Sequence, residues 1–360
     1  MNLLKLSRIK CVLVTGGLGY IGIHTSISLI ENGYKLIIVD SLQNCTLDNL
    51  TRLKKLASKN KSFDFKNLLF YKGDVRDQKF LRRVFQEAIE NGNKIDYVIH
   101  FAGLKSISES IIKPNLYFDV NVNGTKKLLS IMEENNCRNL VFSSSASVYS
   151  KDVKSPLTEN SKVLPENPYG DTKLKVENIL EQTFQSSIEK WQIICLRYFN
   201  PIGAHESGLI GENTGQSTSN LFPLLCEVAA KKRKILFIYG RDWETPDGTG
   251  IRDYIHVMDL AEGHIAAIKY FEKNKTEKIC EILNLGTGKG TSVFELITLF
   301  QKVNNIKIDF IFTDRREGDK AIIYANPAKA KKILSWRPTR NLKRMCIDGW
   351  KWQQKIMQSF

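Results

Sequence analysis

Tyr169 and Lys173 form a Y-x-x-x-K pair, a spacing that places both side chains on one face of a helix, about one turn apart. A free tyrosine has a pKa near 10, so action as a base near pH 7 requires a shift of about three units, or roughly 4 kcal/mol in favour of the phenolate. A nearby positive charge supplies such a bias by opposite-charge attraction. The spacing alone is also typical of an ordinary surface pair, so the surrounding elements must decide.

Hydroxyl side chains are concentrated upstream, at residues 143–147 (SSSAS), where a short apolar run ends. Open α/β sheets bind their ligands outside the carboxyl ends of the strands. A hydroxyl there, assigned to Ser145, can hydrogen-bond a reacting oxygen. A polar strand end without a chemical role is the alternative.

A glycine-rich segment at residues 15–22 (TGGLGYIG) follows one predicted strand and opens a helix. The spacing of Gly16, Gly19 and Gly22 suits a sharp loop whose backbone N–H groups, with a helix N-terminus behind them, approach a pyrophosphate. A Cβ would block that approach. An ordinary turn could carry the same glycines, so the pattern depends on its context.

Three further segments supply that context in register. Asp40 ends the second predicted strand, where a carboxylate can bind both adenosine ribose hydroxyls and would repel a 2′-phosphate. Asp74 follows the third strand and can reach the adenine amino group. Residues 101–105 (FAGLK) end the fourth strand, at the edge where a dinucleotide would run. Together these segments predict a dinucleotide site that prefers NAD to NADP.

The elements that position these residues alternate along the first half of the chain. Short β-branched runs predict strands at 11–15, 35–39, 68–72, 97–101, 139–143 and 193–198. Apolar positions at three- and four-residue spacing predict helices between them, at 21–32, 80–90 and 124–135. This alternation predicts the α/β class, with a doubly wound parallel Rossmann sheet.

The pattern changes after about residue 200, where loops rich in Pro and Gly are mixed with short elements. A late apolar run at 281–285 could return to the main sheet. We expect a cofactor-binding Rossmann domain over 1–200, joined by 254–288, and a smaller mixed α/β substrate-binding domain over 201–360. The cleft between them is the expected site.

Composition narrows the function classes. The chain has 360 residues and a formal net charge of +15, and such a field favours anionic partners. Its basic residues lack the aromatic interleaving of a nucleic-acid module, so we expect no nucleic-acid partner. Seven widely spaced cysteines, without a Cys/His cluster, predict reduced thiols and no metal. Without a signal peptide or membrane-length apolar run, we expect a cytoplasmic protein with no membrane partner.

Seven segments, in the same order and over nearly the whole chain, resemble UDP-glucose 4-epimerases of the extended short-chain dehydrogenase/reductase family. The segments are residues 15–22 (TGGLGYIG), 101–105 (FAGLK), 143–149 (SSSASVY), 169–173 (YGDTK), 197–201 (RYFNP), 247–260 (DGTGIRDYIHVMDL) and 316–319 (REGD). The segments of the second half are the more specific ones, because many dehydrogenases share the glycine loop.

The resemblance implies interconversion of UDP-glucose and UDP-galactose with tightly bound NAD. Tyr169 would take the proton from the sugar 4-hydroxyl while hydride passes from C4 to the nicotinamide. The resulting 4-keto sugar would rotate and be reduced on its other face. Lys173 would tune the tyrosine and hold the nicotinamide ribose, and Ser145 would position O4. Members of the family often dimerise through two helices, here expected to start near Ser106 and Tyr169.

The resemblance also assigns binding residues. The cofactor contacts it implies are Gly16, Gly19, Tyr20, Ile21, Gly22, Asp40, Asp74, Val75, Phe101, Ala102, Gly103, Lys105, Ser143, Tyr169, Lys173 and Tyr198. The contacts to UDP and sugar it implies are Lys105, Ser145, Tyr169, Phe199, Asn200, Asn220, Leu221, Phe237, Tyr239, Arg252, Arg316 and Asp319. Arginine's fork geometry suits the diphosphate.

Two positions depart from part of the family. Four residues after Asp319, where relatives have either a bulky tyrosine or a small residue, this chain has Ile323, which leaves acceptance of N-acetylated UDP-hexoses open. Val120 replaces an asparagine found on the cofactor side in some relatives.

Other functions stay open at this point. An epimerase for N-acetylated UDP-hexoses and a UDP-glucuronate decarboxylase share the fold and the first hydride step. A 4,6-dehydratase needs an acid pair after the serine strand, and Ala146 and Ser147 offer no carboxylate there. The high charge also fits a non-catalytic NAD-binding scaffold or an RNA-associated protein, although the intact catalytic residues weigh against both.

Overall fold

A seven-stranded parallel sheet forms the centre of the computed structural model, which describes residues 8–61, 63–213, 220–316 and 318–358. The sheet order is β11-β6-β5-β4-β1-β2-β3. The strands are β1 (Cys11–Thr15), β2 (Lys35–Asp40), β3 (Leu68–Lys72), β4 (Ile95–His100), β5 (Asn139–Ser145), β6 (Gln192–Tyr198) and β11 (Ile279–Leu285). The doubly wound α/β class is confirmed.

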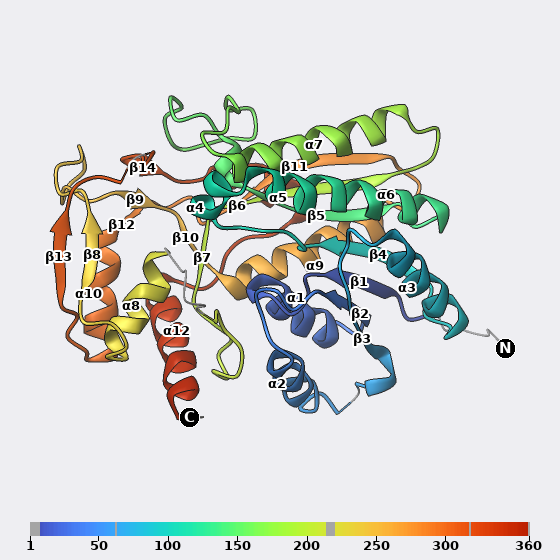
Figure 1. Ribbon diagram of the computed structural model, residues 1–360, viewed down its shortest axis with the longest axis horizontal. Coiled ribbons are helices and arrows are strands. Elements are labelled where there is room, and N and C mark those ends of the chain that lie inside the picture. The colour runs from blue at the N-terminus through green and yellow to red at the C-terminus, as the bar shows by residue number, and fades with distance from the viewer. Residues whose placement is uncertain (1–7, 62, 214–219, 317, 359–360) are drawn as a thin grey trace.

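Helices cover both faces of this sheet (Figure 1). Successive side chains of a strand point to opposite faces, so Val12 and Val14 belong to one apolar cluster while Cys11 and Leu13 belong to another. The first cluster includes side chains of α1 (Tyr20–Glu31), α2 (Asp48–Ala57), α9 (Val257–Lys273) and α11 (Ala328–Leu334). The second includes side chains of α3 (Gln78–Glu90), α6 (Gly124–Glu134) and α7 (Pro168–Ser186).

A continuous stretch of short helices precedes α6. It consists of α4 (Ile107–Ile112), α5 (Pro114–Phe118) and a π-helical turn over Asp119–Asn123 that leads directly into α6. Helices α4 and α5 both contact α7. These three helices therefore lie together beside the carboxyl ends of β4 and β5.

The second half of the chain builds smaller sheets at the other end of the molecule (Figure 1). The strand pairs are β7 (Asn200–Ile202) with β10 (Tyr254–His256), and β8 (Leu236–Tyr239) with β13 (Phe310–Thr313). A three-stranded sheet joins β12 (Thr291–Ser292), β9 (Ile251–Arg252) and β14 (Ile322–Ile323). A third apolar cluster packs α8 (Leu221–Ala229), α10 (Val293–Asn304) and α12 (Leu342–Met357) together.

Strand β11 belongs to the large sheet although it comes after most of these small elements. Its seven residues pair in parallel with β6, from Ile279 beside Gln192 to Leu285 beside Tyr198. The chain therefore returns to the central sheet from the second half. All seven cysteines are unpaired, and within the described ranges no helix is long and apolar enough to cross a membrane.

Candidate active site

Helix α7 brings Tyr169 and Lys173 to the end of β5. The helix begins at Pro168, after the N-cap Asn167, whose side chain accepts a hydrogen bond from the Gly170 backbone N at 2.9 Å. A Cβ on Gly170 would lie 2.5 Å from the Ser147 carbonyl oxygen. The first turn of α7 therefore lies directly against the segment that follows Ser145.

The ammonium of Lys173 is buried and fixed to this strand. Its Nζ donates to the Ser143 carbonyl oxygen at 2.7 Å and lies 5.8 Å from the Tyr169 ring centroid. Burial lowers the pKa of Lys173 to about 8, while the charge of Glu177 opposes that shift. The lysine is therefore mostly charged near neutral pH, and a carboxylate contributes to that charge.

Burial raises the pKa of Tyr169, and a hydrogen bond with Ser145 works in the opposite direction. The protein's own groups therefore favour the neutral phenol. From the sequence we expect a nearby positive charge to lower this pKa. Lys173 on its own does not reverse the effect of burial.

The glycine loop between β1 and α1 is in close contact with neighbouring backbone atoms. Gly16 has a φ of +69°, and a Cβ on it would lie 2.7 Å from the Ala102 backbone N. A Cβ on Gly22 would lie 2.2 Å from the Gly16 carbonyl oxygen. Gly19 is the N-cap of α1, and Ile21 follows in the first turn. The chain thus provides a close cradle with a helix N-terminus behind it.

Asp40 ends β2 beside this cradle. It is 7% exposed and accepts hydrogen bonds from the backbone N of Leu18 at 3.0 Å and of Leu42 at 2.9 Å. The Cys45 thiol donates to the same carboxylate at 3.4 Å. These contacts fix the carboxylate, and its remaining lone pairs are available to a ribose.

Asp74 is also engaged by the protein. Arg76 binds both of its oxygens and reaches Asp119 at 2.9 Å. These hydrogen bonds lower the pKa of Asp74, so its carboxylate stays ionised. Val75 beside it is buried. The expected adenine contact therefore lies next to an ion pair that the sequence analysis did not foresee.

The segment after β4 lies across the glycine loop. Phe101 N donates to the Thr15 carbonyl oxygen at 2.9 Å, and a Cβ on Gly103 would lie 2.9 Å from Asn121 Oδ1. Lys105 Nζ pairs with Glu212 Oε1 at 2.9 Å and lies 6.0 Å from the Tyr20 ring centroid. Sequence reasoning missed Glu212, because no motif relates residues 107 positions apart.

Three consecutive residues connect the two halves. Tyr198 ends β6, and its hydroxyl donates to His264 Nε2 at 2.5 Å, because His264 Nδ1 donates to a backbone carbonyl. Phe199 is buried. Asn200 begins β7 with an exposed side chain, and its backbone N donates to the Asp253 carbonyl oxygen at 2.9 Å.

An aromatic and cationic group lies on the small sheets. Phe237 and Tyr239 alternate with buried residues along β8, so both rings are on its exposed face. The Arg316 guanidinium lies 4.3 Å from the Tyr239 ring centroid. Arg252 lies 3.5 Å from Asp319. This arrangement can sandwich a planar base and bind an anionic linker.

Two further residues that the sequence predicts to bind substrate lie at the start of α8. Asn220 is its exposed N-cap residue, and Leu221 is its first residue. Ile323 pairs with Arg252 across β14 and β9 and packs in a cluster that contains Phe199 and Tyr149. Ile323 therefore lies between the arginine of the small sheets and the segment after β6.

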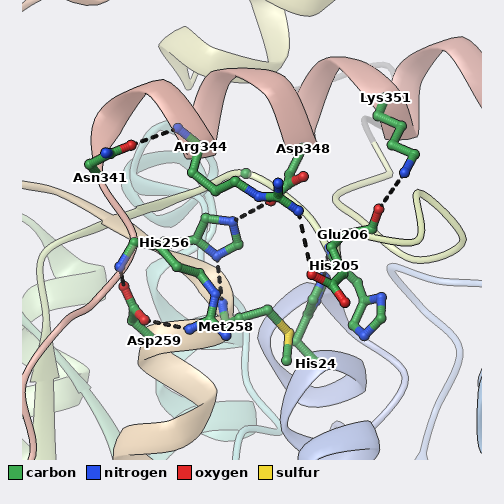
Figure 2. A network of polar contacts seen from close by, with 12 residues as sticks. His24, His205, Glu206, His256, Met258, Asp259, Asn341, Arg344, Asp348 and Lys351 are labelled. Carbon is green, nitrogen blue, oxygen red and sulfur yellow. Dashed lines mark hydrogen bonds and ion pairs between the residues drawn. The ribbon is translucent and has the colours of Figure 1, made fainter.

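Figure 2 shows a polar network between α1, the segment at residues 205–206 and α12. His24 Nε2 accepts from the backbone N of His205 at 3.1 Å, and Arg344 pairs with both Glu206, at 3.4 Å, and Asp348, at 2.6 Å. A cavity of about 570 Å³ adjoins this network. None of the residues assigned to cofactor or substrate lines it, so the cavity is separate from the candidate site.

Comparisons with known proteins assign the chain to a family. A family model described as GDP-mannose 4,6 dehydratase matches residues 13–348. UDP-glucose 4-epimerase 2 of Arabidopsis thaliana is 47% identical over 343 residues, which cover 95% of each protein. The chain belongs to the UDP-glucose 4-epimerase family. The resemblance found in the sequence is confirmed.

Solved structures of UDP-glucose 4-epimerases have the same fold. The Bifidobacterium longum protein, in complex with NAD+ and UDP, is 42% identical with a TM-score of 0.88. The Stenotrophomonas maltophila protein, with bound NAD and formylated UDP-arabinopyranose, is 39% identical with a TM-score of 0.91. In both comparisons the match covers 98% of this chain and 100% of the other.

Proposed function

We propose that this protein interconverts UDP-glucose and UDP-galactose with tightly bound NAD. The observation that carries the proposal is that Tyr169, Lys173 and Ser145 lie together at the end of β5. The chain that places them there is 47% identical to a UDP-glucose 4-epimerase over nearly its full length. The NAD complexes of two relatives support the cofactor.

The residues of the first half fit NAD. At Gly16 and Gly22 the surrounding backbone is so close that a Cβ would not fit. Helix α1 starts at this loop without a side-chain cap, so its first backbone N–H groups would be available to a pyrophosphate. Asp40 is fixed at the end of β2, beside the glycine loop, where its carboxylate would accept hydrogen bonds from a ribose. When bound, NAD supplies hydride acceptance at C4 and a positive ring beside Tyr169. We assign the cofactor contacts to the sixteen residues named from the sequence.

The chain's own residues hold and move the proton. Tyr169 takes it from the sugar 4-hydroxyl and later returns it, and Ser145 holds the 4-oxygen through its hydroxyl. Lys173, fixed to the Ser143 carbonyl oxygen, keeps a positive charge beside the tyrosine. This charge and the positive ring that bound NAD would add act together against the effect of burial, which favours the neutral phenol.

The second half would bind UDP. We assign the uracil to Phe237 and Tyr239, the diphosphate to Arg252 and Arg316, and the uridine ribose to Asp319. Asn200, Asn220, Leu221, Phe199 and Lys105 complete the proposed contacts. On this assignment residues 1–200, with 254–288, form the NAD-binding domain, and 201–360 form the UDP-sugar-binding domain.

We also propose a cytoplasmic homodimer. Four apolar side chains on α4 and α5 are exposed: Ile107 at 46%, Ile111 at 63%, Ile112 at 78% and Phe118 at 38%. A contiguous apolar patch of this kind is uncommon on a monomer and typical of an interface. A second copy is its proposed occupant, since α4 begins next to Ser106, where the first of the two dimer helices is expected, and contacts α7, which carries Tyr169.

The proposal is tested by incubating the purified protein with UDP-galactose, without added NAD, and measuring UDP-glucose by NMR. We expect turnover by the natural protein and a loss of at least a hundredfold for Tyr169→Phe, because general acid–base catalysis contributes about 10² to 10⁴. The variant keeps its ring, so equal thermal unfolding of both proteins is the control. No turnover by the natural protein, even with NAD supplied, would refute the proposal.

A parallel reaction with UDP-N-acetylgalactosamine tests the alternative substrate class. Ile323 is half-buried against Phe199 and Tyr149, so its side chain limits the space near the sugar. Turnover of this substrate at a rate similar to that of UDP-galactose would extend the proposed function to N-acetylated sugars.

A further inference from the structure

Glu177 and Arg197 form an ion pair buried directly behind the catalytic residues. Arg197 donates from Nε to Glu177 Oε1 at 2.9 Å and from Nη2 to Oε2 at 2.7 Å, and both side chains are at most 3% exposed. The pair is bidentate, which is the strongest geometry for these groups. Neither residue belongs to the set assigned to substrate or cofactor.

The pair is connected to all three catalytic residues. Ser144 donates to Glu177 Oε1 at 2.5 Å and lies opposite Arg197 in the register of β5 and β6. Ser144 stands between Ser143, which accepts from Lys173, and Ser145, which bonds Tyr169. Glu177 lies one helical turn after Lys173 on α7. One carboxylate thus joins the strand and the helix that carry the catalytic groups.

Stability alone gives little reason for charges at this place. Removing two ions from water costs several kcal/mol each, and a buried ion pair is often no more stable than apolar residues of the same volume. A second feature makes the place specific. Lys173 is itself buried, and Glu177 is the carboxylate whose charge opposes the effect of burial on that lysine.

We infer that Glu177, held in place by Arg197 and Ser144, is a positioning residue that keeps Lys173 charged beside Tyr169. This inference rests on the proposed function. Arg197 is itself anchored, because its guanidinium lies 4.8 Å from the Tyr149 ring centroid and the Tyr149 hydroxyl donates to Asn284 at 2.6 Å. The other titratable groups near the lysine are Tyr169 and the buried His100, which is neutral.

The test compares pH profiles. Glu177→Gln keeps an oxygen that accepts from Ser144 but leaves the Arg197 charge buried and unpaired, so this variant can fail to fold. The double variant Glu177→Gln/Arg197→Met removes both charges at similar volume and is the main test. Glu181→Gln is the matched control, because it removes an exposed carboxylate one turn further along α7.

The alkaline limb of kcat/KM for UDP-galactose is expected to fall by about one pH unit in the double variant, which is tenfold in the protonation equilibrium. The sign follows from the charge of Glu177, which acts on Lys173 and favours the ammonium, so its loss is expected to outweigh the opposite effect of losing the Arg197 charge. Glu181→Gln should keep the natural profile. A double variant that folds and loses activity equally at every pH would overturn the inference, because that result indicates a purely structural role.

A second readout does not depend on turnover. The 13Cε resonance of Lys173, identified by its absence in Lys173→Met, reports the ionisation of the lysine in the holoenzyme. An unchanged titration in the double variant overturns the inference, and a midpoint lowered by about one unit supports it. An inactive natural protein with a shifted lysine midpoint in the double variant would refute the proposed reaction and leave the role of Glu177 standing.

Discussion

Gly170 occupies the closest approach between α7 and the segment after β5. Any side chain there would meet the Ser147 carbonyl oxygen at 2.5 Å, and a backbone atom cannot turn aside as the end of a side chain can. The neighbouring residue is Tyr169, whose hydrogen bond with Ser145 depends on that approach. Glycine is needed at this position because the two elements lie too close together for a side chain. Its backbone conformation does not require glycine.

Gly170→Ala is therefore expected to reduce kcat at least tenfold and to destabilise the protein by about 1 to 3 kcal/mol, as for overpacking elsewhere. The helix should move away from β5 and carry the tyrosine with it. Steady-state kinetics with UDP-galactose and urea unfolding provide the measurements.

The control for this substitution is Gly263→Ala in α9. There a Cβ would meet the flexible end of the Leu285 side chain, at 2.7 Å, and no backbone atom. That variant should keep its kcat even where it loses stability. An active Gly170→Ala would show that the close contact does not position Tyr169.

Residues with a signature spacing were accessible from the sequence, and residues that act through tertiary neighbours were not. Tyr169, Lys173 and Gly16 belong to local patterns whose physical reason is visible in a few positions. Glu177 and Arg197 meet because a helix packs on two adjacent strands, and the sequence carries no sign of that meeting. The ion pair of Lys105 with Glu212 is hidden for the same reason.

At the scale of elements, the long strands of the parallel sheet could be predicted from the sequence, and the short strands of the second half could not. Predicted strands at 11–15 and 68–72 coincide with β1 and β3, because each is a short run of apolar residues of strand length. Every residue of β1 is buried, whereas β3 lies at the edge of the sheet and is only partly buried. Strands β9, β12 and β14 have two residues each, too few for any periodicity. Their positions depend on the sheet they form together. The π-helical turn over Asp119–Asn123 also lacked a sequence signal.

The exposed apolar side chains of α4 lead to a prediction about the oligomeric state. The double variant Ile111→Glu/Ile112→Glu should be monomeric in light scattering at micromolar concentration, whereas the natural protein should be a dimer. Thermal unfolding measured at low concentration should change little, because both side chains are exposed within one chain.

Ile188→Glu serves as the matched control, since this isoleucine is 97% exposed and lies just beyond the end of α7. It should leave the dimer intact. A natural protein that is monomeric at the same concentration would contradict the proposed interface.

Across the whole molecule, three histidines are buried in neutral form. Burial lowers the pKa of His24 and His100 to about 3 and of His264 to about 4, against an ordinary value of 6.5. Their hydrogen bonds join α1 to the backbone of His205, β4 to α6 and α9 to β6. As the pH falls, the unfolded chain binds protons at these three histidines at a higher pH than the folded chain does.

The contribution of these histidines to the free energy of unfolding should therefore be fully present above pH 6.5 and be lost progressively as the pH falls toward 4. Each histidine is expected to remove about 2 kcal/mol from the free energy of unfolding at pH 5. Urea unfolding at pH 7.5 and pH 5 measures the difference. His24→Gln, which cannot take up the proton, should lose about a third less between these two pH values, and equal free energies at both would contradict the linkage.

The late return of β11 has a consequence for biosynthesis. Until the ribosome has made residues 279–285, the outer edge of β6 has no partner, although every residue of β6 is buried in the finished protein. At 5 to 20 residues per second the delay after β6 is roughly 4 to 17 seconds. A nascent chain with an open apolar edge strand is a substrate for aggregation or for a chaperone during that interval. Translation speed between residues 198 and 285 is thus a variable in the yield of this protein.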